Sequence, residues 1–154
     1  MAFLIRRYVK ADHARVLELH LLGLKQFDAE SPRGKWDADI DDIEGVYLSN
    51  KGEFLVGELD GEVVAIGGFW RKTEKMAELK RMRVDPKFQR RGFGQAILTE
   101  LEKRAKSMGY SYMFLDTLPI MAPARRLYTK NGFVQTGTKK VGRFDAILYE
   151  KVLE

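Results

Sequence analysis

The chain has 154 residues, of which 45% are hydrophobic and 32% are charged, and these proportions are typical of one folded domain spanning residues 1–154. It contains no cysteine, which excludes disulfides, thiolate metal ligands and a cysteine nucleophile. The net charge is +5, no apolar run is long enough to span a membrane and no signal peptide is recognisable, so we expect a cytoplasmic protein without a membrane partner.

The apolar pattern predicts strands and helices that alternate along the chain. Asp12 is placed to cap the first helix, Asp60–Gly61 is a strong hairpin signal, and Asn131–Gly132 is suited to end the last helix. In chain order we expect a strand at Phe3–Tyr8, a helix from Asp12 to about Leu24, a short acidic helix around Ala38–Tyr47, strands at Phe54–Leu59, Val63–Trp70 and Ala77–Val84, a helix that follows Gly94 and stops at Gly109, a strand at Tyr112–Thr117, a helix from Pro123 to Lys130, and strands at Phe133–Thr138 and Phe144–Val152. This order predicts an α/β fold in which a mixed, mostly antiparallel sheet carries helices on both faces.

Residues 28–44 are strongly acidic. Seven acids and two bases give this segment a net charge of −5; the acids are Asp28, Glu30, Asp37, Asp39, Asp41, Asp42 and Glu44. Such a surface would attract a cation. Alternatively, Asp37 and Asp39 cap a helix, whose N-terminus favours negative charge.

The most informative stretch joins the strand Ala77–Val84 to the helix that follows Gly94. Six bases and one acid lie between Lys80 and Arg91, so this stretch carries +5, which equals the net charge of the whole chain. Gly92 and Gly94 can adopt unusual backbone conformations, and the first N–H groups of a helix have no partner within it. We therefore predict a phosphate-binding loop for a compact anion such as a nucleotide-containing cofactor, with a solvated basic loop as the alternative.

Competing sites fit the sequence less well. A dinucleotide-binding fingerprint requires a small residue where Ile97 stands and a glycine directly after the strand, although Asp116 lies at a suitable distance for a ribose contact. No Gly-Lys-Ser/Thr sequence is present, and the basic loop has only two aromatic residues with which to stack bases. His13 and His20 lie seven residues apart on one helix and are expected to pack or face solvent. We expect neither a metal site nor a nucleic-acid partner.

Two motifs follow each other along the chain. Gln89–Gly94 has the pattern Q/R-x-x-G-x-G/A, and Ala124–Phe133 has the pattern A-x-x-L-Y-x-x-x-G-F. These motifs, with the strands Glu78–Pro86 and Leu115–Thr117 that precede them, resemble the GNAT superfamily of acyl-CoA-dependent N-acyltransferases. The resemblance covers Ile5 to about Val152, and it implies a GNAT-like fold and the transfer of an acetyl group from acetyl-CoA to a primary amine.

The resemblance implies acetyl-CoA as the co-substrate. Backbone N–H groups of the loop would hold the pyrophosphate, and those of Met82 and Val84 would bind the pantetheine arm and polarise the thioester carbonyl. The expected cofactor-binding residues are Met82, Arg83, Val84, Gln89, Arg90, Arg91, Gly92, Phe93, Gly94 and Gln95. Met121 stands where many members of the family have asparagine, so one polar contact with the pantetheine arm is expected to be missing.

Tyr128 and Glu78 are the catalytic residues that the resemblance implies. Tyr128 would donate a hydrogen bond to the departing thiolate and complete the proton transfer late; alternatively, its ring packs beside Leu127. Glu78 would remove a proton from the amine, unless water does so. The alternative is a structural Glu78 that pairs with a strand neighbour such as Lys80.

The acceptor is not identified by the sequence. In the family, the segment that corresponds to residues 28–44 forms one wall of the acceptor site, so Asp39 and Asp42 are expected to bind a small cationic amine. A protein or peptide amine is the second possibility, and the protein could act as a homodimer. The alternative function is a non-catalytic CoA-binding sensor or interaction module.

Overall fold

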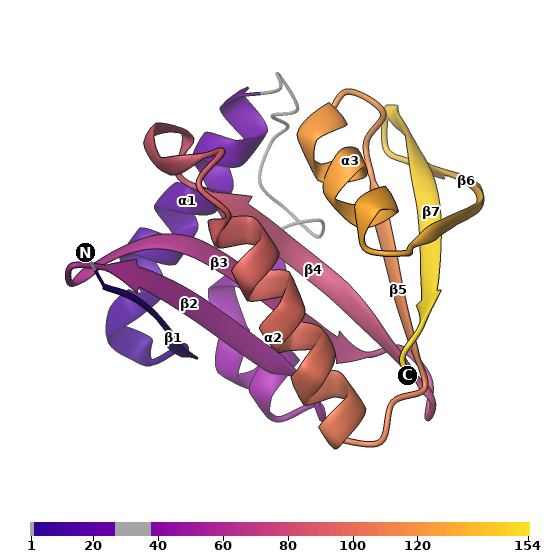
Figure 1. The fold of residues 1–154 in the computed structure, drawn as a ribbon, viewed down its shortest axis with the longest axis horizontal. Helices are drawn as coiled ribbons and strands as arrows, with labels where there is room; N and C mark the ends of the chain where they lie inside the picture. Colours follow the sequence, from indigo (N-terminus) through magenta and orange to yellow (C-terminus); the bar gives the residue numbers. More distant parts are fainter. Residues whose placement is uncertain (1, 27–37) are drawn as a thin grey trace.

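A seven-stranded sheet runs through the middle of the computed structural model, which describes residues 2–26 and 38–154 (Figure 1). In the described residues the strands lie in the order β1-β2-β3-β4-β5-β7-β6, and every neighbouring pair is antiparallel except the parallel pair β4 and β5. The elements are β1 (Phe3–Arg7), α1 (His13–Gln26), β2 (Glu53–Leu59), β3 (Glu62–Arg71), β4 (Met76–Val84), α2 (Phe93–Ser107), β5 (Tyr112–Thr117), α3 (Ala122–Lys130), β6 (Val134–Val141) and β7 (Phe144–Val152). The predicted α/β class and mixed, mostly antiparallel sheet are confirmed.

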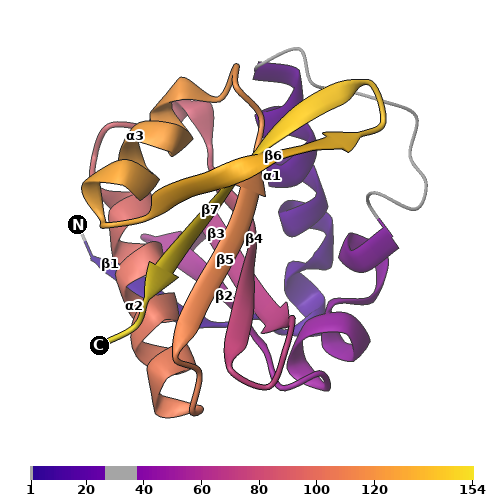
Figure 2. The same ribbon diagram turned by 90° about the vertical axis from the view of Figure 1, so that its right-hand side faces the viewer.

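Helices cover both faces of the sheet, as Figure 2 shows with α1 on one side and α2 and α3 on the other. On the first face, Val16 and Leu19 of α1 belong to the same buried cluster as Phe54 of β2. On the second face, Ile97 and Leu101 of α2 are fully buried against the sheet. Because both faces are covered, the central strands β2 and β3 are apolar in nearly continuous runs rather than in alternation.

The two parallel strands at the centre of the sheet separate after a few residues. β4 pairs with β5 only at Met76, Ala77 and Glu78. Farther along, the register between β3 and β4 shifts, and Arg81 adopts a left-handed backbone with φ 59°, as in a β-bulge. The bulge bends β4 away from its parallel neighbour. On the side of β5, the second half of β4 therefore borders an opening in the sheet, while its other side stays paired with β3.

Most predicted elements agree with the structure to within a few residues, but two differences have physical causes. The acidic helix predicted around Ala38–Tyr47 is a 3₁₀ turn at Ala38–Asp42 followed by a π-helical turn at Glu44–Leu48. The Asp42 side chain accepts a hydrogen bond from the Gly45 N–H group, and such local bonds compete with α-helix formation. Asp12 lies in a 3₁₀ turn just before α1 and accepts the Val9 N–H group, so it caps this turn rather than α1 itself.

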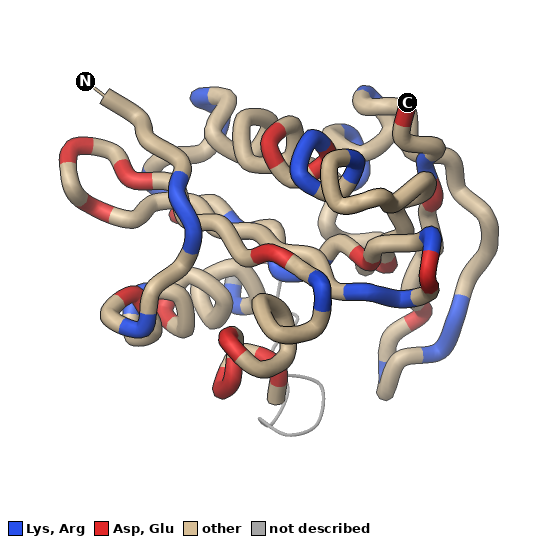
Figure 3. Tube along the Cα trace, turned by 90° about the horizontal axis from the view of Figure 1, so that it is seen from below, with Lys and Arg blue, Asp and Glu red and all other residues tan. Residues whose placement is uncertain are grey.

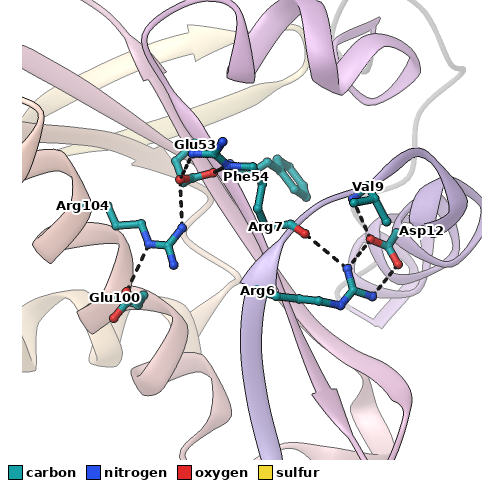
Figure 4. Close-up of polar contacts among 8 residues, drawn as sticks. All are labelled: Arg6, Arg7, Val9, Asp12, Glu53, Phe54, Glu100 and Arg104. Carbon is teal, nitrogen blue, oxygen red and sulfur yellow. Dashed lines mark hydrogen bonds and ion pairs between the residues drawn. The ribbon is translucent and has the colours of Figure 1, made fainter.

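Ion pairs join the first strands to the helices (Figure 4). Arg6 of β1 donates to both carboxylate oxygens of Asp12 at 2.8 and 2.9 Å. Glu53, at the start of β2, accepts hydrogen bonds at 2.9 Å from Arg7 and at 3.0 Å from Arg104 of α2. The Glu53 side chain is only 2% exposed, so its charge depends on these two arginines. This carboxylate fixes α2 to the edge of β2.

Replacing Glu53 by glutamine should destabilise the fold by about 2 kcal/mol, because two arginines would lose the buried negative charge and one of its two acceptor oxygens. Burial alone would raise the pKa of Glu53, but hydrogen bonds from Arg7 and Arg104 lower it below its usual range. A carboxylate whose pKa is lower in the folded protein than in the unfolded chain stabilises the fold at pH values above its unfolded-state pKa. This stabilisation is lost as the pH falls through its folded-state pKa. The difference in the free energy of unfolding between the parent and Glu53→Gln, measured by urea denaturation, should therefore be largest at neutral pH and smallest in acid. The control Glu100→Gln, at the half-exposed partner of Arg104, should cost less than about 1 kcal/mol; equal costs would contradict this account.

Candidate active site

The predicted phosphate-binding loop borders a cavity of about 430 Å³ between the end of β4, the start of α2 and α3. Nine of the ten predicted cofactor-binding residues line it. The exception is Arg91, whose guanidinium lies over the Phe88 ring at 5.4 Å from the ring centroid. The sequence pattern therefore identified the components of one continuous cavity.

The backbone of the loop is shaped to leave N–H groups accessible at the start of α2. Gly92, the residue before the helix, has φ 84°, and a β-carbon built on it meets nothing within 4 Å. The Gln89 side chain donates to the Val84 carbonyl at 3.0 Å and fixes the loop to the end of β4. Asp85 accepts the Lys87 N–H group and is paired with Arg15 of α1 at 2.7 Å. The loop is held from both sides while the helix start faces the cavity.

The basic residues of this stretch do not gather at one loop, which corrects the expectation from the sequence. Lys80 lies 3.7 Å from Glu78, and Arg81 pairs with Asp39 at 2.6 Å, both within the opening beside β4. Acidic and basic positions are spread over the whole trace (Figure 3). The reason is that the run crosses the end of a strand: Lys80, Arg81 and Arg83 lie on β4 and line this opening, whereas the other three bases follow β4 in the loop.

A second cavity, of about 990 Å³, occupies the opening between β4 and β5. It extends from Asp39 and Trp70 on one side to the hairpin of β6 and β7 on the other. Five residues border both this cavity and the loop cavity: Met82, Arg83, Met121, Ala124 and Tyr128. The two cavities are therefore adjacent along these residues, which we call their shared wall.

Backbone N–H groups of β4 face the same opening. The Asp85 N–H group donates to the Val64 carbonyl of β3 at 2.8 Å. Because successive N–H groups of a strand point to opposite sides, that of Val84 points away from β3, toward the side where β5 has separated. The Val84 N–H group is thus available to a pantetheine arm, as predicted. Because N–H directions alternate, we expect the Met82 N–H group to face the same side.

Tyr128 of α3 lies in the wall that the two cavities share. Its side chain is buried, and its ring packs against Phe133 and Tyr149 at centroid distances of 5.7 and 6.4 Å. Burial raises the pKa of Tyr128 to about 12, although the charge of Arg83 opposes this rise. These ring partners differ from Leu127, the neighbour that the sequence suggested, and the catalytic role of Tyr128 stays a prediction. The hydroxyl is nevertheless a protonated group beside both cavities.

Glu78 of β4 lines the larger cavity and is held by two neighbours. Trp70 donates its indole N–H to one carboxylate oxygen at 3.0 Å, and Lys80 lies 3.7 Å from the other. The Lys80 ammonium also lies over the Trp70 ring, 5.0 Å from its centroid. The carboxylate is therefore fixed in orientation, with 12% of its side chain exposed to the cavity. The sequence suggested Lys80 as a partner, but it gave no signal for Trp70.

The two aspartates predicted to bind the acceptor lie in different surroundings. Asp39 lines the larger cavity, where it accepts hydrogen bonds from Arg81 and from the Tyr47 hydroxyl at 2.6 Å. Burial would raise the pKa of Asp39, but Arg81 lowers it below its usual range. Asp42 is exposed and accepts the Gly45 N–H group. Three other acids of the predicted wall, Asp28, Glu30 and Asp37, lie outside the described residues.

Met121, the residue before α3, borders both cavities and is 8% exposed. Its sulfur lies 3.8 Å from the Thr117 hydroxyl, which donates toward it. The thioether is a weak acceptor and has no donor, so it cannot replace the two-way hydrogen bonding of an amide. The expected loss of one polar contact at this position therefore stays a prediction.

Residues 2–26 and 38–154 contain neither a membrane-spanning helix nor a preformed metal site. No helix in this part of the chain is long and apolar enough to cross a membrane. No group of three or more histidine, aspartate or glutamate side chains is arranged there to hold a metal ion.

A helix N-terminus beside a cavity, a separated pair of parallel strands and a buried tyrosine together define a site for an anionic cofactor and a second reactant. Residues 17–133 match the model of the acetyltransferase (GNAT) family. The chain belongs to this family. The GNAT-like fold expected from the sequence is therefore confirmed.

Curated and solved relatives agree with this assignment. The chain is 34% identical over 105 residues to human N-acetyltransferase 8, an alignment that covers 64% of this chain and 46% of that protein. It thus spans less than half of that relative's length. The fold is similar to that of a GNAT acetyltransferase from Staphylococcus aureus Mu50, with a TM-score of 0.90, 22% identity and coverage of 99% and 100%. It is also similar to yncA from Salmonella typhimurium, a structure solved with acetyl-CoA, with a TM-score of 0.80, 23% identity and coverage of 100% and 95%.

Proposed function

We propose that this protein transfers an acetyl group from acetyl-CoA to a primary amine, by direct attack of the amine on the thioester. The observation that carries the proposal is the shared wall at Tyr128, where the cavity beside the phosphate-binding loop meets the larger cavity. Two reactants that enter from different sides can be brought together there, which removes much of the entropic cost of their reaction.

The residues around the smaller cavity fit CoA. Gly92 places no side chain over the start of α2, so a pyrophosphate can approach the free N–H groups of the helix. Arg90 and Lys130 also line this cavity and supply positive charge. Acetyl-CoA would supply an activated thioester, and the N–H groups of Met82 and Val84 would orient its arm along β4.

Tyr128 would stabilise the negative charge that develops on the departing sulfur. With a pKa of about 12, its hydroxyl stays protonated throughout the physiological range. An ordinary thiol has a pKa of about 8.5, so full proton transfer from this phenol to the thiolate is unfavourable by about 5 kcal/mol. Tyr128 therefore acts as a hydrogen-bond donor, and CoA leaves as a thiolate that takes its proton from water.

Glu78 would accept the proton of the attacking amine, directly or through one water. We expect Glu78→Gln to lower kcat about tenfold or more while the Kd for CoA stays unchanged, because Glu78 lines only the larger cavity. The glutamine keeps an oxygen for Trp70, so the site should stay folded. Steady-state kinetics on the variant and on the exposed control Glu74→Gln provide the measurement. Unchanged turnover in both would assign proton removal to water and leave Glu78 as the partner of Trp70 and Lys80.

A thiol-release assay with acetyl-CoA and a panel of primary amines tests the proposed reaction. Acceptor-dependent release of CoA, with an acetylated amine identified by mass spectrometry, is the expected result. CoA binding without release for any amine would instead favour the non-catalytic sensor or interaction module. The cytoplasmic location and the homodimer expected from the sequence stay predictions.

A further inference from the structure

The larger cavity carries more positive than negative charge. Its described lining contains three acids and five bases, a net charge of +2: the acids are Asp39, Glu78 and Asp116, and the bases are Lys80, Arg81, Arg83, Lys139 and Arg143. This balance is opposite in sign to the acidic wall that the sequence suggested for the acceptor.

Two of the three acids already have basic partners within the cavity. Asp39 is held by two hydrogen bonds from Arg81, at 2.6 and 2.9 Å, and Glu78 lies 3.7 Å from Lys80. An acceptor cation would have to compete with these partners. Among the described acids of the lining, Asp116 remains for the acceptor, and it lies close enough to Tyr128 to affect the pKa of that residue.

The β6–β7 hairpin separates its charges between two surfaces. Lys140 and Asp145 pair with each other at 2.9 Å, and neither lines the cavity. Lys139, one residue earlier and therefore on the other face of β6, does line it, as does Arg143 in the turn. The hairpin thus neutralises its outer charges and turns two cations toward the cavity.

The acid and the two cations lie at different ends of the cavity. Asp116 pairs in register with Leu148 of β7, near the end of β5. Lys139 pairs with Ala146, two residues earlier in β7, and Arg143 precedes β7 at the tip of the hairpin. Near Tyr128 the charge of Asp116 is opposed by that of Arg83, whereas the described lining at the hairpin end carries two cations, Lys139 and Arg143, and no acid. An acceptor whose carboxylate points toward the hairpin and whose amine lies beside Asp116 fits this arrangement.

We propose that the acceptor is an amine that also carries a carboxylate, as an amino acid does, with its amine directed to Tyr128 and Asp116 and its carboxylate to Lys139 and Arg143. This inference rests on the proposed acetyl transfer and names its substrate class. It replaces the small cationic amine that the acidic segment of the sequence suggested. The apolar lining contributed by Trp70 would pack against the body of such a molecule.

The test compares each common amino acid with its own α-carboxamide as acceptors in the thiol-release assay. Each pair shares one side chain and differs in the carboxylate alone. For the best acceptor, kcat/KM should be at least about tenfold higher for the acid than for the amide, since a charge-assisted contact is worth about that much. An amide that equals or exceeds its acid in every pair would overturn the inference and leave acetyl transfer intact. Release with another primary amine of the panel, but with no acid or amide, would also overturn only the inference, whereas no release with any amine would overturn the proposed function as well.

Variants of the β6–β7 hairpin test which residues bind the carboxylate. The double variant Lys139→Gln, Arg143→Gln should raise KM for the acid about tenfold, and it should leave both KM for the amide and the Kd for CoA unchanged. Lys140→Gln removes the same charge from the outer face of β6 and is the matched control, with the parent kinetics expected. Equal effects of the two changes, or a loss that is the same for acid and amide, would contradict recognition of a carboxylate by these residues.

Discussion

Replacing Tyr128 by phenylalanine should lower kcat about 100-fold or more, the usual scale when one hydrogen-bond donor to a developing negative charge is lost. The affinity for acetyl-CoA should stay within about twofold, because the ring keeps its packing against Phe133 and Tyr149. Since the pKa of Tyr128 is about 12, the hydroxyl is protonated below that pH and its contribution is lost only above it. The parent kcat should therefore show no fall between about pH 7 and pH 10 that depends on this residue.

A neighbouring tyrosine provides the control. Tyr149 is also buried and contacts the Tyr128 ring, but it borders neither cavity, and its hydroxyl accepts a hydrogen bond from Arg125 at 3.2 Å. Tyr149→Phe should lose a little stability and keep its turnover. If both variants lost turnover equally, the effect would come from packing around α3, and Tyr128 would not act on the leaving group.

Replacing Gly92 by valine should abolish measurable CoA binding. The added side chain would project from the residue before α2 into the space where the phosphates approach the helix N-terminus. Valine would also be strained at φ 84°, which costs about 1–3 kcal/mol of stability. Isothermal titration with CoA provides the measurement. Gly94 is a weaker test, because a β-carbon there would make only ordinary contacts with Val84 and Leu127, at 3.5 and 3.8 Å.

A second glycine beside the same helix distinguishes the effect of backbone strain from the loss of CoA binding. Gly109 follows the other end of α2 and has φ 96°, and a β-carbon at this residue would likewise meet nothing within 4 Å. Gly109→Val should therefore lose similar stability but bind CoA as the parent does. A folded Gly92→Val protein that keeps its affinity for CoA would show that the phosphates lie elsewhere.

Much of the fold and half of the site could be predicted from local sequence. The apolar positions of α2, including Ile97 and Leu101, repeat at helical spacing, and the glycine at each end of α2 marks where the helix begins and stops. The loop cavity was predictable because most of its residues are contiguous in the chain and follow one strand. The acidic segment near residue 40 was not, because short turns held by side-chain bonds such as that of Asp42 have no period.

The larger cavity depends on contacts between distant residues. Arg81 meets Asp39 across 42 positions of sequence, and both were counted in the sequence as free charges. The Trp70 bond to Glu78 depends on the register of β3 with β4, which a single sequence does not reveal. The direction of Lys139 depends likewise on the register of β6. Charge totals therefore did not reveal which acids are already paired in the larger cavity, whereas the spacing of the motif placed most loop residues along one cavity.

A crystal structure of the protein with acetyl-CoA would show directly whether CoA binds beside the loop and can meet an amine at Tyr128. We expect the pyrophosphate at the N-terminus of α2 beside Gly92, the arm along Met82 and Val84, and the thioester at the wall shared by the two cavities. A pyrophosphate bound away from the start of α2, or a thioester directed away from Tyr128, would contradict this expectation.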